Sequence, residues 1–165
     1  MRIEQARPEE LSIVREIVQK TIVTIYPAYY PAGAVEFFRR HHSDEAIRAD
    51  LEAGRVYLLW DEAGPAGTVT VHGDEMGRLF VLPDRQGRGL GRRLMDFAEA
   101  RIAEGHDEIR LDASLPAKAI YLRRGYVSAE YHVLPVEGGQ YLCYDVMRKP
   151  ANKPFGEEEH NNDSH

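Results

Sequence analysis

Three glycines at alternate positions, Gly87, Gly89 and Gly91, separate an apolar stretch from a helix-like stretch of the sequence. A backbone without side chains can approach an anion closely, and the N–H groups of a first helical turn carry the positive end of the helix dipole. Three arginines add cations beside this turn: Arg88, Arg92 and Arg93. The loop is therefore predicted to bind a phosphate or pyrophosphate group. The alternative is a tight glycine turn with a solvated basic face.

Two common phosphate-binding loops do not fit this stretch. A Walker loop ends in Gly-Lys-Ser or Gly-Lys-Thr, whereas two arginines follow Gly91. A dinucleotide fingerprint needs a further glycine three residues after its second one, but Arg92 and Leu94 stand at those positions. Asp112 does lie at about the distance expected of a ribose-binding acid. A nucleotide-binding regulator therefore remains an alternative.

The sequence around the loop predicts a strand, the loop, a helix and a second strand. Apolar residues from Leu79 to Val81 precede the loop, and an amphipathic stretch from Leu90 to Ile102 follows it and ends near Gly105. The next strand is predicted over Glu108 to Ala113. Together these segments form one βαβ unit, so its two strands should be parallel.

The remaining segments predict a mixed α/β fold with a mostly antiparallel sheet. An apolar stripe from Leu11 to Ile25 predicts a helix, and further helices are expected from near Gly33 and from Ser43 to before Gly54. A short helix is expected over Pro116 to Arg124. Strands are expected over 2–6, 56–60, 67–72, 76–82, 126–133 and 141–147, with turns at Gly64-Pro65, Gly73-Asp74 and Glu137-Gly138-Gly139.

The bulk composition favours one compact domain. The chain has 165 residues, of which 43% are hydrophobic, and no apolar run approaches the roughly 20 residues that span a bilayer. We expect a single domain over residues 1–149, a cytoplasmic location and no membrane partner. The polar tail, 150–165, is predicted to be disordered and carries half of the net charge of −6. The remaining charge argues against nucleic acid and mildly favours a cationic substrate.

Cysteine and histidine usage predicts no metal. Cys143 is the only cysteine, so it forms no internal disulfide, and a small apolar residue in a strand is favoured over a nucleophile. No H-E-x-x-H spacing is present. The histidines predicted either to line an acceptor site or to be ordinary surface or core residues are His41, His42, His72 and His132.

Two motifs together resemble one protein family. Gln86-x-x-Gly89-x-Gly91, preceded by Val81-x-Pro83, resembles the coenzyme A pyrophosphate loop of the GNAT (GCN5-related) N-acetyltransferases. A second stretch is similar to the family's short helix that ends in a glycine and an aromatic residue: Ser114-x-x-Ala117-x-x-x-Tyr121-x-x-x-Gly125-Tyr126. The closing Met147-Arg148-Lys149 is similar to its final strand, so the resemblance covers roughly residues 1–149.

The resemblance implies that the parallel strands splay apart, with helices on both faces, and that acetyl-CoA is the co-substrate. Backbone N–H groups near Phe80 or Val81 would stabilise the oxyanion. The acetyl group would move directly to the amine, in agreement with a sequence that has no Ser or Cys in a nucleophile-elbow context. The positions implied to bind the coenzyme are Leu79, Phe80, Val81, Gln86, Gly87, Arg88, Gly89, Leu90, Gly91, Arg92, Ser114, Ala117, Tyr121 and Arg124.

By the same resemblance, two side chains are candidates for proton transfer. Tyr121 occupies the position of the general acid, although a tyrosine on a short helix is often only core packing. The spacing of Glu75 before Gln86 resembles that of a general base. Since Asp74 and Glu75 follow Gly73, the alternative is that Glu75 belongs to an exposed hairpin turn. In many relatives a water relay replaces a side-chain base.

The activity implied is N-acetylation of a primary amine on a small molecule or a peptide. The alternative is a non-catalytic acyl-CoA-binding or sensor module, in which a phenol beside the thioester sulfur has no role. The loop from Tyr26 to Tyr30 contains three tyrosines. They could form a wall that attracts a cationic acceptor, or a contact between two copies of the chain in a homodimer.

Overall fold

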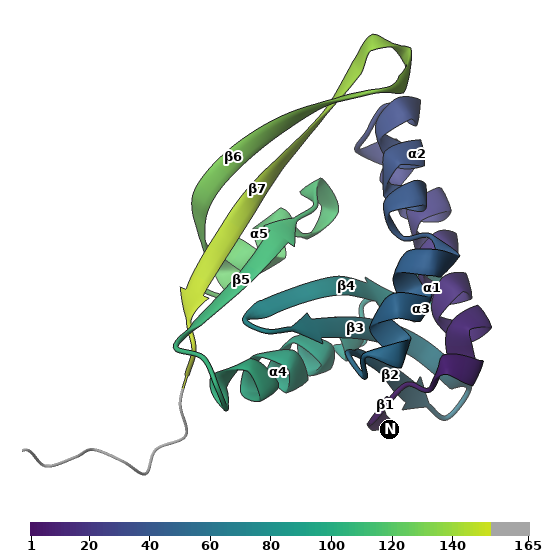
Figure 1. Cartoon of the computed structure of the whole chain (residues 1–165), viewed down its shortest axis with the longest axis vertical. Helices are drawn as coiled ribbons and strands as arrows, with labels where there is room; N and C mark the ends of the chain where they lie inside the picture. Colours follow the sequence, from purple (N-terminus) through teal and green to yellow (C-terminus); the bar gives the residue numbers. More distant parts are fainter. Residues whose placement is uncertain (153–165) are drawn as a thin grey trace, which may run out of the picture.

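The protein folds around one seven-stranded sheet, shown in Figure 1 as a computed structural model that describes residues 1–152. Its strands are β1 Arg2–Gln5, β2 Val56–Asp61, β3 Gly64–His72, β4 Glu75–Val81, β5 Glu108–Ala113, β6 Val127–Val136 and β7 Gln140–Pro150. They lie in the order β1-β2-β3-β4-β5-β7-β6. Every neighbouring pair is antiparallel except β4 and β5, which are parallel. The predicted mixed, mostly antiparallel sheet is confirmed.

Helices cover both faces of the sheet, as predicted. The α-helices are α1 Leu11–Ile25, α2 Ala32–His41, α3 Asp44–Glu52, α4 Leu90–Ala103 and α5 Leu115–Arg123. Short 3₁₀ turns are η1 Pro8–Glu10, η2 Tyr26–Ala28, η3 Pro83–Arg85 and η4 Glu137–Gly139. Neighbouring side chains of a strand face opposite sides, so Leu59 of β2 packs in the core beneath α4, and Leu58 packs in the core beneath α1.

The parallel strands β4 and β5 pair over a single position. Glu75 lies opposite Arg110, and the Arg110 backbone N–H donates to the Asp74 carbonyl at 2.9 Å. Beyond this pair, no ladder position joins the two strands within residues 1–152. The two strands therefore splay apart toward their carboxyl ends, and the edge of β4 that faces β5 is left without a partner strand.

Element boundaries differ from the predictions at three places. Gly64 and Pro65 are not a turn but the start of β3, because the turn forms earlier, where the Ala63 N–H donates to Asp61 Oδ1 at 2.8 Å. The turn at 137–139 is confirmed, but both flanking strands are longer than predicted. Strand β7 extends to Pro150, one residue into the predicted tail; residues 153–165 lie outside the described part of the chain.

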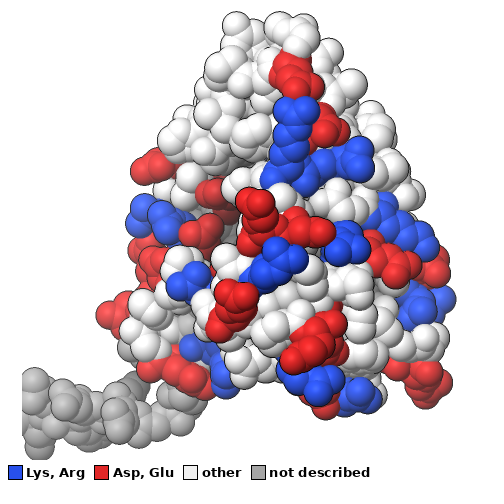
Figure 2. Space-filling view, turned by 45° about the vertical axis from the view of Figure 1, so that its right-hand side comes forward, with Lys and Arg blue, Asp and Glu red and all other residues white. Residues whose placement is uncertain are grey.

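The surface carries charges of both signs. Figure 2 shows lysines and arginines interleaved with acidic side chains, so the face in view has no continuous basic patch. Among the helices of residues 1–152, none combines the length and the apolar character needed to cross a bilayer.

A half-buried carboxylate, Glu99, connects α4 to α5 and β7. It accepts hydrogen bonds from Arg124 Nη2 at 2.8 Å, from the Tyr126 hydroxyl at 2.8 Å and from Lys149 Nζ at 3.3 Å. Burial disfavours the charged form of Glu99, but the hydrogen bonds from Arg124 and Tyr126 outweigh it, so the pKa of Glu99 is lowered. This network fixes the carboxyl end of α5 against α4.

We expect Glu99→Gln to lower the free energy of unfolding by about 1–3 kcal/mol, because it leaves buried donors without their carboxylate. The folded pKa lies below the ordinary value of 4.5, so the contribution is present above that pH and is lost as the pH falls through the folded pKa. Urea unfolding at about pH 7 and about pH 3.5 should show the difference between variant and wild type shrinking. Glu104→Gln, at the exposed end of the same helix, is the control. An equal loss in the free energy of unfolding in Glu99→Gln and Glu104→Gln would contradict the stabilising role assigned to the Glu99 network.

Candidate active site

The glycine loop leads directly into the first turn of α4. Gly87 and Gly89 have φ angles of 76° and 79°, in the left-handed region that favours glycine. Apart from the glycine itself and the residues on either side of it, no atom lies within 4 Å of the position that a Cβ would take at either residue. Gly89 is the N-cap of α4, and no side chain accepts a hydrogen bond from this helix start. The loop therefore presents an open backbone to an anion.

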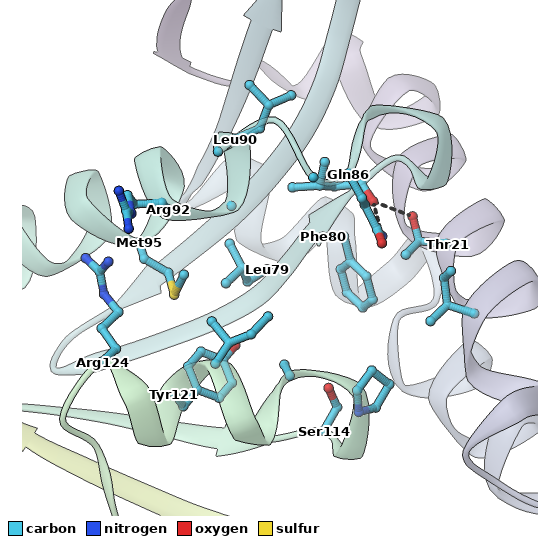
Figure 3. A pocket seen from close by; sticks show the side chains of 18 of the residues that line it. Thr21, Leu79, Phe80, Gln86, Leu90, Arg92, Met95, Ser114, Tyr121 and Arg124 are labelled. Atoms are coloured by element: carbon cyan, nitrogen blue, oxygen red, sulfur yellow. Dashed lines mark hydrogen bonds between the residues drawn. The ribbon is translucent and has the colours of Figure 1, made fainter.

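A cavity of about 650 Å³ lies beside this loop, between α4 and α5 (Figure 3). All but one of the predicted coenzyme-binding positions line it. The exception is Arg88, which is exposed, because the turn made by Gly87 and Gly89 leaves its side chain in solvent. Lining residues that the sequence analysis missed are Thr21, Ile25, Tyr26, Met95, Pro116, Ile120 and Arg123.

Gln86 anchors the loop to the end of β4. Its Nε2 donates to the Val81 carbonyl at 3.0 Å, and Thr21 Oγ1 of α1 donates to the same oxygen at 3.3 Å. These contacts are dashed in Figure 3. The carbonyl of Val81 is therefore already occupied. Because the Leu82 N–H donates to the Ala66 carbonyl of β3, alternation along the strand turns the backbone groups of Leu79 and the N–H of Val81 toward the free edge.

Three arginines line the cavity: Arg92, Arg123 and Arg124. Arg124 donates to Glu99 and also to Asp96, so its charge is balanced within the protein. Arg92 and Arg123 form no ion pair with a carboxylate of residues 1–152. They are the cations that remain for a ligand's phosphate groups.

Tyr121 projects from α5 toward Leu79 of β4 (Figure 3). Only 6% of the residue is exposed, and its ring lies edge-on to Tyr126 with centroids 5.7 Å apart. Burial, together with the nearby Tyr26, raises the pKa of the Tyr121 phenol. Within residues 1–152 its hydroxyl makes no hydrogen bond, so a protonated phenol faces the cavity at neutral pH.

Comparison with known proteins agrees with this geometry. The family described as acetyltransferase (GNAT) domain matches residues 25–134, more than half of the chain. The chain belongs to the GNAT acetyltransferase family. No curated protein matches the sequence.

Solved structures with the GNAT fold are similar over nearly the whole chain. A GCN5-related N-acetyltransferase from Rhodopseudomonas palustris has a TM-score of 0.81 and 24% identity over 90% of this chain and 94% of its own. PaiA N-acetyltransferase from Thermoplasma acidophilum, solved with coenzyme A, has a TM-score of 0.67 and 17% identity over 90% and 98%. YncA from Salmonella typhimurium, a putative acetyltransferase solved with acetyl-CoA, has a TM-score of 0.67 and 19% identity over 96% and 98%. At these identities the likeness establishes the fold.

This GNAT domain has a second cavity, of about 320 Å³, on the α2 side of β4. Much of its wall is apolar and comes from α2, β6 and β7: Phe37, Phe38, Leu134, Leu142 and Tyr144. It shares five lining residues with the first cavity: Tyr26, Leu79, Phe80, Ser114 and Tyr121. The two cavities therefore meet at the free edge of β4, beside the Tyr121 ring.

Glu75 lines the second cavity. It begins β4 and is half-buried, so the exposed turn is formed by residues 73–74 and not by Glu75. Its Oε2 lies 3.2 Å from Arg110 Nη2. Burial and the neighbouring Asp112 raise its pKa, against the opposing charges of Arg110 and His72. A carboxylate with a raised pKa at this place is suited to accept a proton from an amine.

The predicted histidines divide between the cavities and the surface. His41 and His42 line the second cavity, and His72 lines a small adjoining cavity of about 140 Å³. His132 instead pairs with Glu130 at 3.1 Å and stacks on Tyr144. Within residues 1–152, no three His, Cys, Asp or Glu side chains are grouped to hold a metal ion.

The remaining candidate residues differ in where they lie relative to the two cavities. Tyr26 and Tyr30 are buried, and the Tyr30 hydroxyl accepts from the Leu115 N–H at 2.6 Å, so of the three loop tyrosines only Tyr29 is largely exposed. Cys143 is half-buried and lines neither cavity. Asp112 lines the second cavity. The sheet is not a doubly wound parallel one, so Asp112 does not stand at the ribose-binding position of a dinucleotide fold.

His42 gives the fold a pH dependence that can be measured. Burial, Arg78 and His41 lower its pKa to about 3, whereas an unfolded histidine titrates near 6.5. Below pH 6.5 the His42 imidazole binds a proton in the unfolded state but not in the folded state, so the free energy of unfolding falls as the pH drops.

We expect the free energy of unfolding to fall by about 2 kcal/mol between about pH 7 and pH 5, and His42→Gln to remove most of that fall. Urea unfolding across this range measures it. His106→Gln, at an exposed histidine, should keep the wild-type dependence. A His42→Gln curve parallel to the wild type would contradict the prediction.

Proposed function

We propose that this protein transfers the acetyl group of acetyl-CoA directly to a primary amine of a small molecule or a peptide. The observation that carries the proposal is the meeting of two cavities at the free edge of β4. The larger cavity adjoins the glycine loop and suits the coenzyme. The smaller cavity has Glu75 in its wall and suits the amine. PaiA and YncA, solved with coenzyme A and acetyl-CoA, share the fold and support assigning the larger cavity to the coenzyme.

The described residues fit the coenzyme along its length. The open backbone of Gly87 and Gly89 and the uncapped start of α4 offer donors to the pyrophosphate, with Arg92 and Arg123 as cations. The free edge of β4 then offers backbone groups to the amides of the pantetheine arm. Met95 and other apolar side chains line the walls between α4 and α5. These features support a binding mode with the thioester end where the two cavities meet.

The reaction needs an electrophile, which acetyl-CoA supplies as its thioester carbonyl. Backbone N–H near Phe80 or Val81 would hold the carbonyl oxygen as it gains charge. The amine nitrogen forms a bond to the carbonyl carbon, and the bond from carbon to sulfur breaks. Tyr121 gives its phenolic proton to the departing thiolate, and Glu75 or a water molecule takes the proton released by the amine.

Burial acts on both partners in the proton transfer to sulfur. It raises the pKa of Tyr121, which makes the phenol a weaker acid but keeps it protonated until it is needed. A thiolate formed in the same apolar surroundings has its own basicity raised. The phenol can therefore donate first a hydrogen bond and then the proton.

A panel of primary amines, read out through release of the free thiol, tests the proposed activity. Thermal shift with acetyl-CoA separates binding from turnover. Stabilisation by acetyl-CoA together with amine-dependent thiol release supports the proposal. Stabilisation without thiol release for any amine would instead support the non-catalytic acyl-CoA-binding module.

Tyr121→Phe should lower kcat by about 100-fold or more, because the thiolate loses its proton donor. Its affinity for coenzyme A should stay near the wild-type value, since the ring still packs in place. Steady-state kinetics and isothermal titration measure the two quantities. Tyr29→Phe removes a hydroxyl from an exposed tyrosine and serves as the control. Wild-type turnover in Tyr121→Phe would exclude this residue as the acid.

Gly89→Ala should weaken coenzyme A binding about tenfold and cost about 1 kcal/mol of stability, because alanine disfavours a φ of 79°. Gly105→Ala is the matched control: its Cβ also meets nothing within 4 Å, but its φ is not in the left-handed region. Titration and urea unfolding compare them. Equal coenzyme affinity in both variants would argue against pyrophosphate binding at the loop.

A further inference from the structure

Strand β4 carries a bulge where the two cavities meet. One residue of β3, Val69, lies opposite two residues of β4, Arg78 and Leu79. Such an insertion reverses the alternation of side chains beyond it. As a result Leu79 packs in the core on the α4 side, whereas Phe80 packs in the core on the α1 side. The bulge therefore decides which way the β4 edge presents its backbone at the proposed reaction centre.

Arg78 has a backbone conformation that arginine rarely adopts. Its φ of 43° is the only positive value at a non-glycine residue of the described chain, 1–152. A non-glycine residue in this region is strained by about 1–2 kcal/mol, so surrounding contacts must hold it there.

The side chain of Arg78 supplies those contacts. It is 7% exposed, and its Nη1 donates to Asp50 Oδ2 of α3 at 2.8 Å and to Thr70 Oγ1 of β3 at 3.2 Å. Its Nε donates to His42 Nδ1, just after α2, at 3.3 Å. One buried guanidinium thus connects the bulge to two helices and to the neighbouring strand.

The contact with His42 also determines where the imidazole carries its proton. A guanidinium has only donors, so Nδ1 of His42 must be the acceptor. The neutral ring then carries its proton on Nε2. This ring lies edge-on to Phe80, with centroids 5.4 Å apart and planes at 85°, so it packs against the residue that follows the bulge.

We infer that Arg78 is a positioning residue that clamps the β4 bulge to α3 and holds His42 in the Nε2–H form, and so sets the geometry of the backbone from Leu79 to Val81. The effect on catalysis rests on the proposed function. The clamp and the protonation form of His42 do not depend on the proposed function, and both can be measured whether or not the protein is an acetyltransferase.

Two substitutions separate the clamp from its surroundings. Arg78→Gly removes the guanidinium, while glycine adopts a φ of 43° without strain, so the backbone has no local reason to change. Arg55→Met is the matched control, because Arg55 Nη1 approaches the same Asp50 carboxylate, at 3.4 Å, from a more exposed position. Arg78→Lys keeps the charge but loses the fork of donors.

In steady-state kinetics, Arg78→Gly should lower kcat about tenfold or more, because the backbone N–H groups that donate to the thioester carbonyl shift. The KM for acetyl-CoA should change by less than about threefold, because the glycine loop that binds the coenzyme is unchanged. Arg78→Lys should restore part of kcat, and Arg55→Met should match the wild type. A wild-type kcat in Arg78→Gly, or an equal loss in Arg55→Met, would overturn the inference.

Nitrogen NMR of the histidine rings tests the clamp without any turnover. The His42 ring, assigned by its absence in His42→Gln, should show the Nε2–H form in the wild type and in Arg55→Met. In Arg78→Gly it should show a mixture of the two neutral forms and should titrate at higher pH. If the wild type transferred no acetyl group, the proposed function would fail. The comparison of the His42 spectra of the wild type and Arg78→Gly would still test the clamp. An unchanged His42 signal in Arg78→Gly would overturn it.

Discussion

The loss of pairing between β4 and β5 after one residue is the constraint on which the site depends. Strands held together at Glu75 and Arg110 and apart at their carboxyl ends leave a backbone edge in the middle of a covered sheet. Both cavities open onto that edge, and α5 with Tyr121 closes it from the side. The network around Glu99 fixes α5 against α4 and so holds in place Arg124, which lines the larger cavity.

Local sequence patterns predicted the parts of this arrangement that depend on local physics. Alternate glycines before an amphipathic helix indicate an open helix start, and the strands on either side indicate a parallel pair, whatever the rest of the fold. Contributions from distant segments left no such pattern: Thr21 reaches Val81 from α1, and Arg123 lines the cavity from the end of α5. The bulge in β4 was also missed, because the run from Met76 to Leu82 is consistent with a regular strand and nothing in it marks the inserted residue.

Burial has one common effect on the side chains around the meeting point of the cavities. It raises the pKa of Tyr121 and of Glu75, and it lowers the pKa of His42. In each case it favours the uncharged form. The cations nearby, Arg78 and Arg110, are paired with carboxylates. The burial that disfavours charge also lowers the local dielectric, which strengthens the hydrogen bonds that backbone N–H groups make to a developing oxyanion.

The bulge carries an arginine and not a glycine, and this choice is explained by the need to hold the backbone N–H donors of β4 in a fixed position. Glycine would adopt the conformation of residue 78 freely, but it would also leave the bulge free to take others. Arg78 accepts about 1–2 kcal/mol of backbone strain, and its hydrogen bonds to Asp50, Thr70 and His42 hold a single geometry. Since a shift of about 1 Å in a positioning group can cost about 100-fold in rate, a strained but fixed residue is the better support for the backbone that follows it.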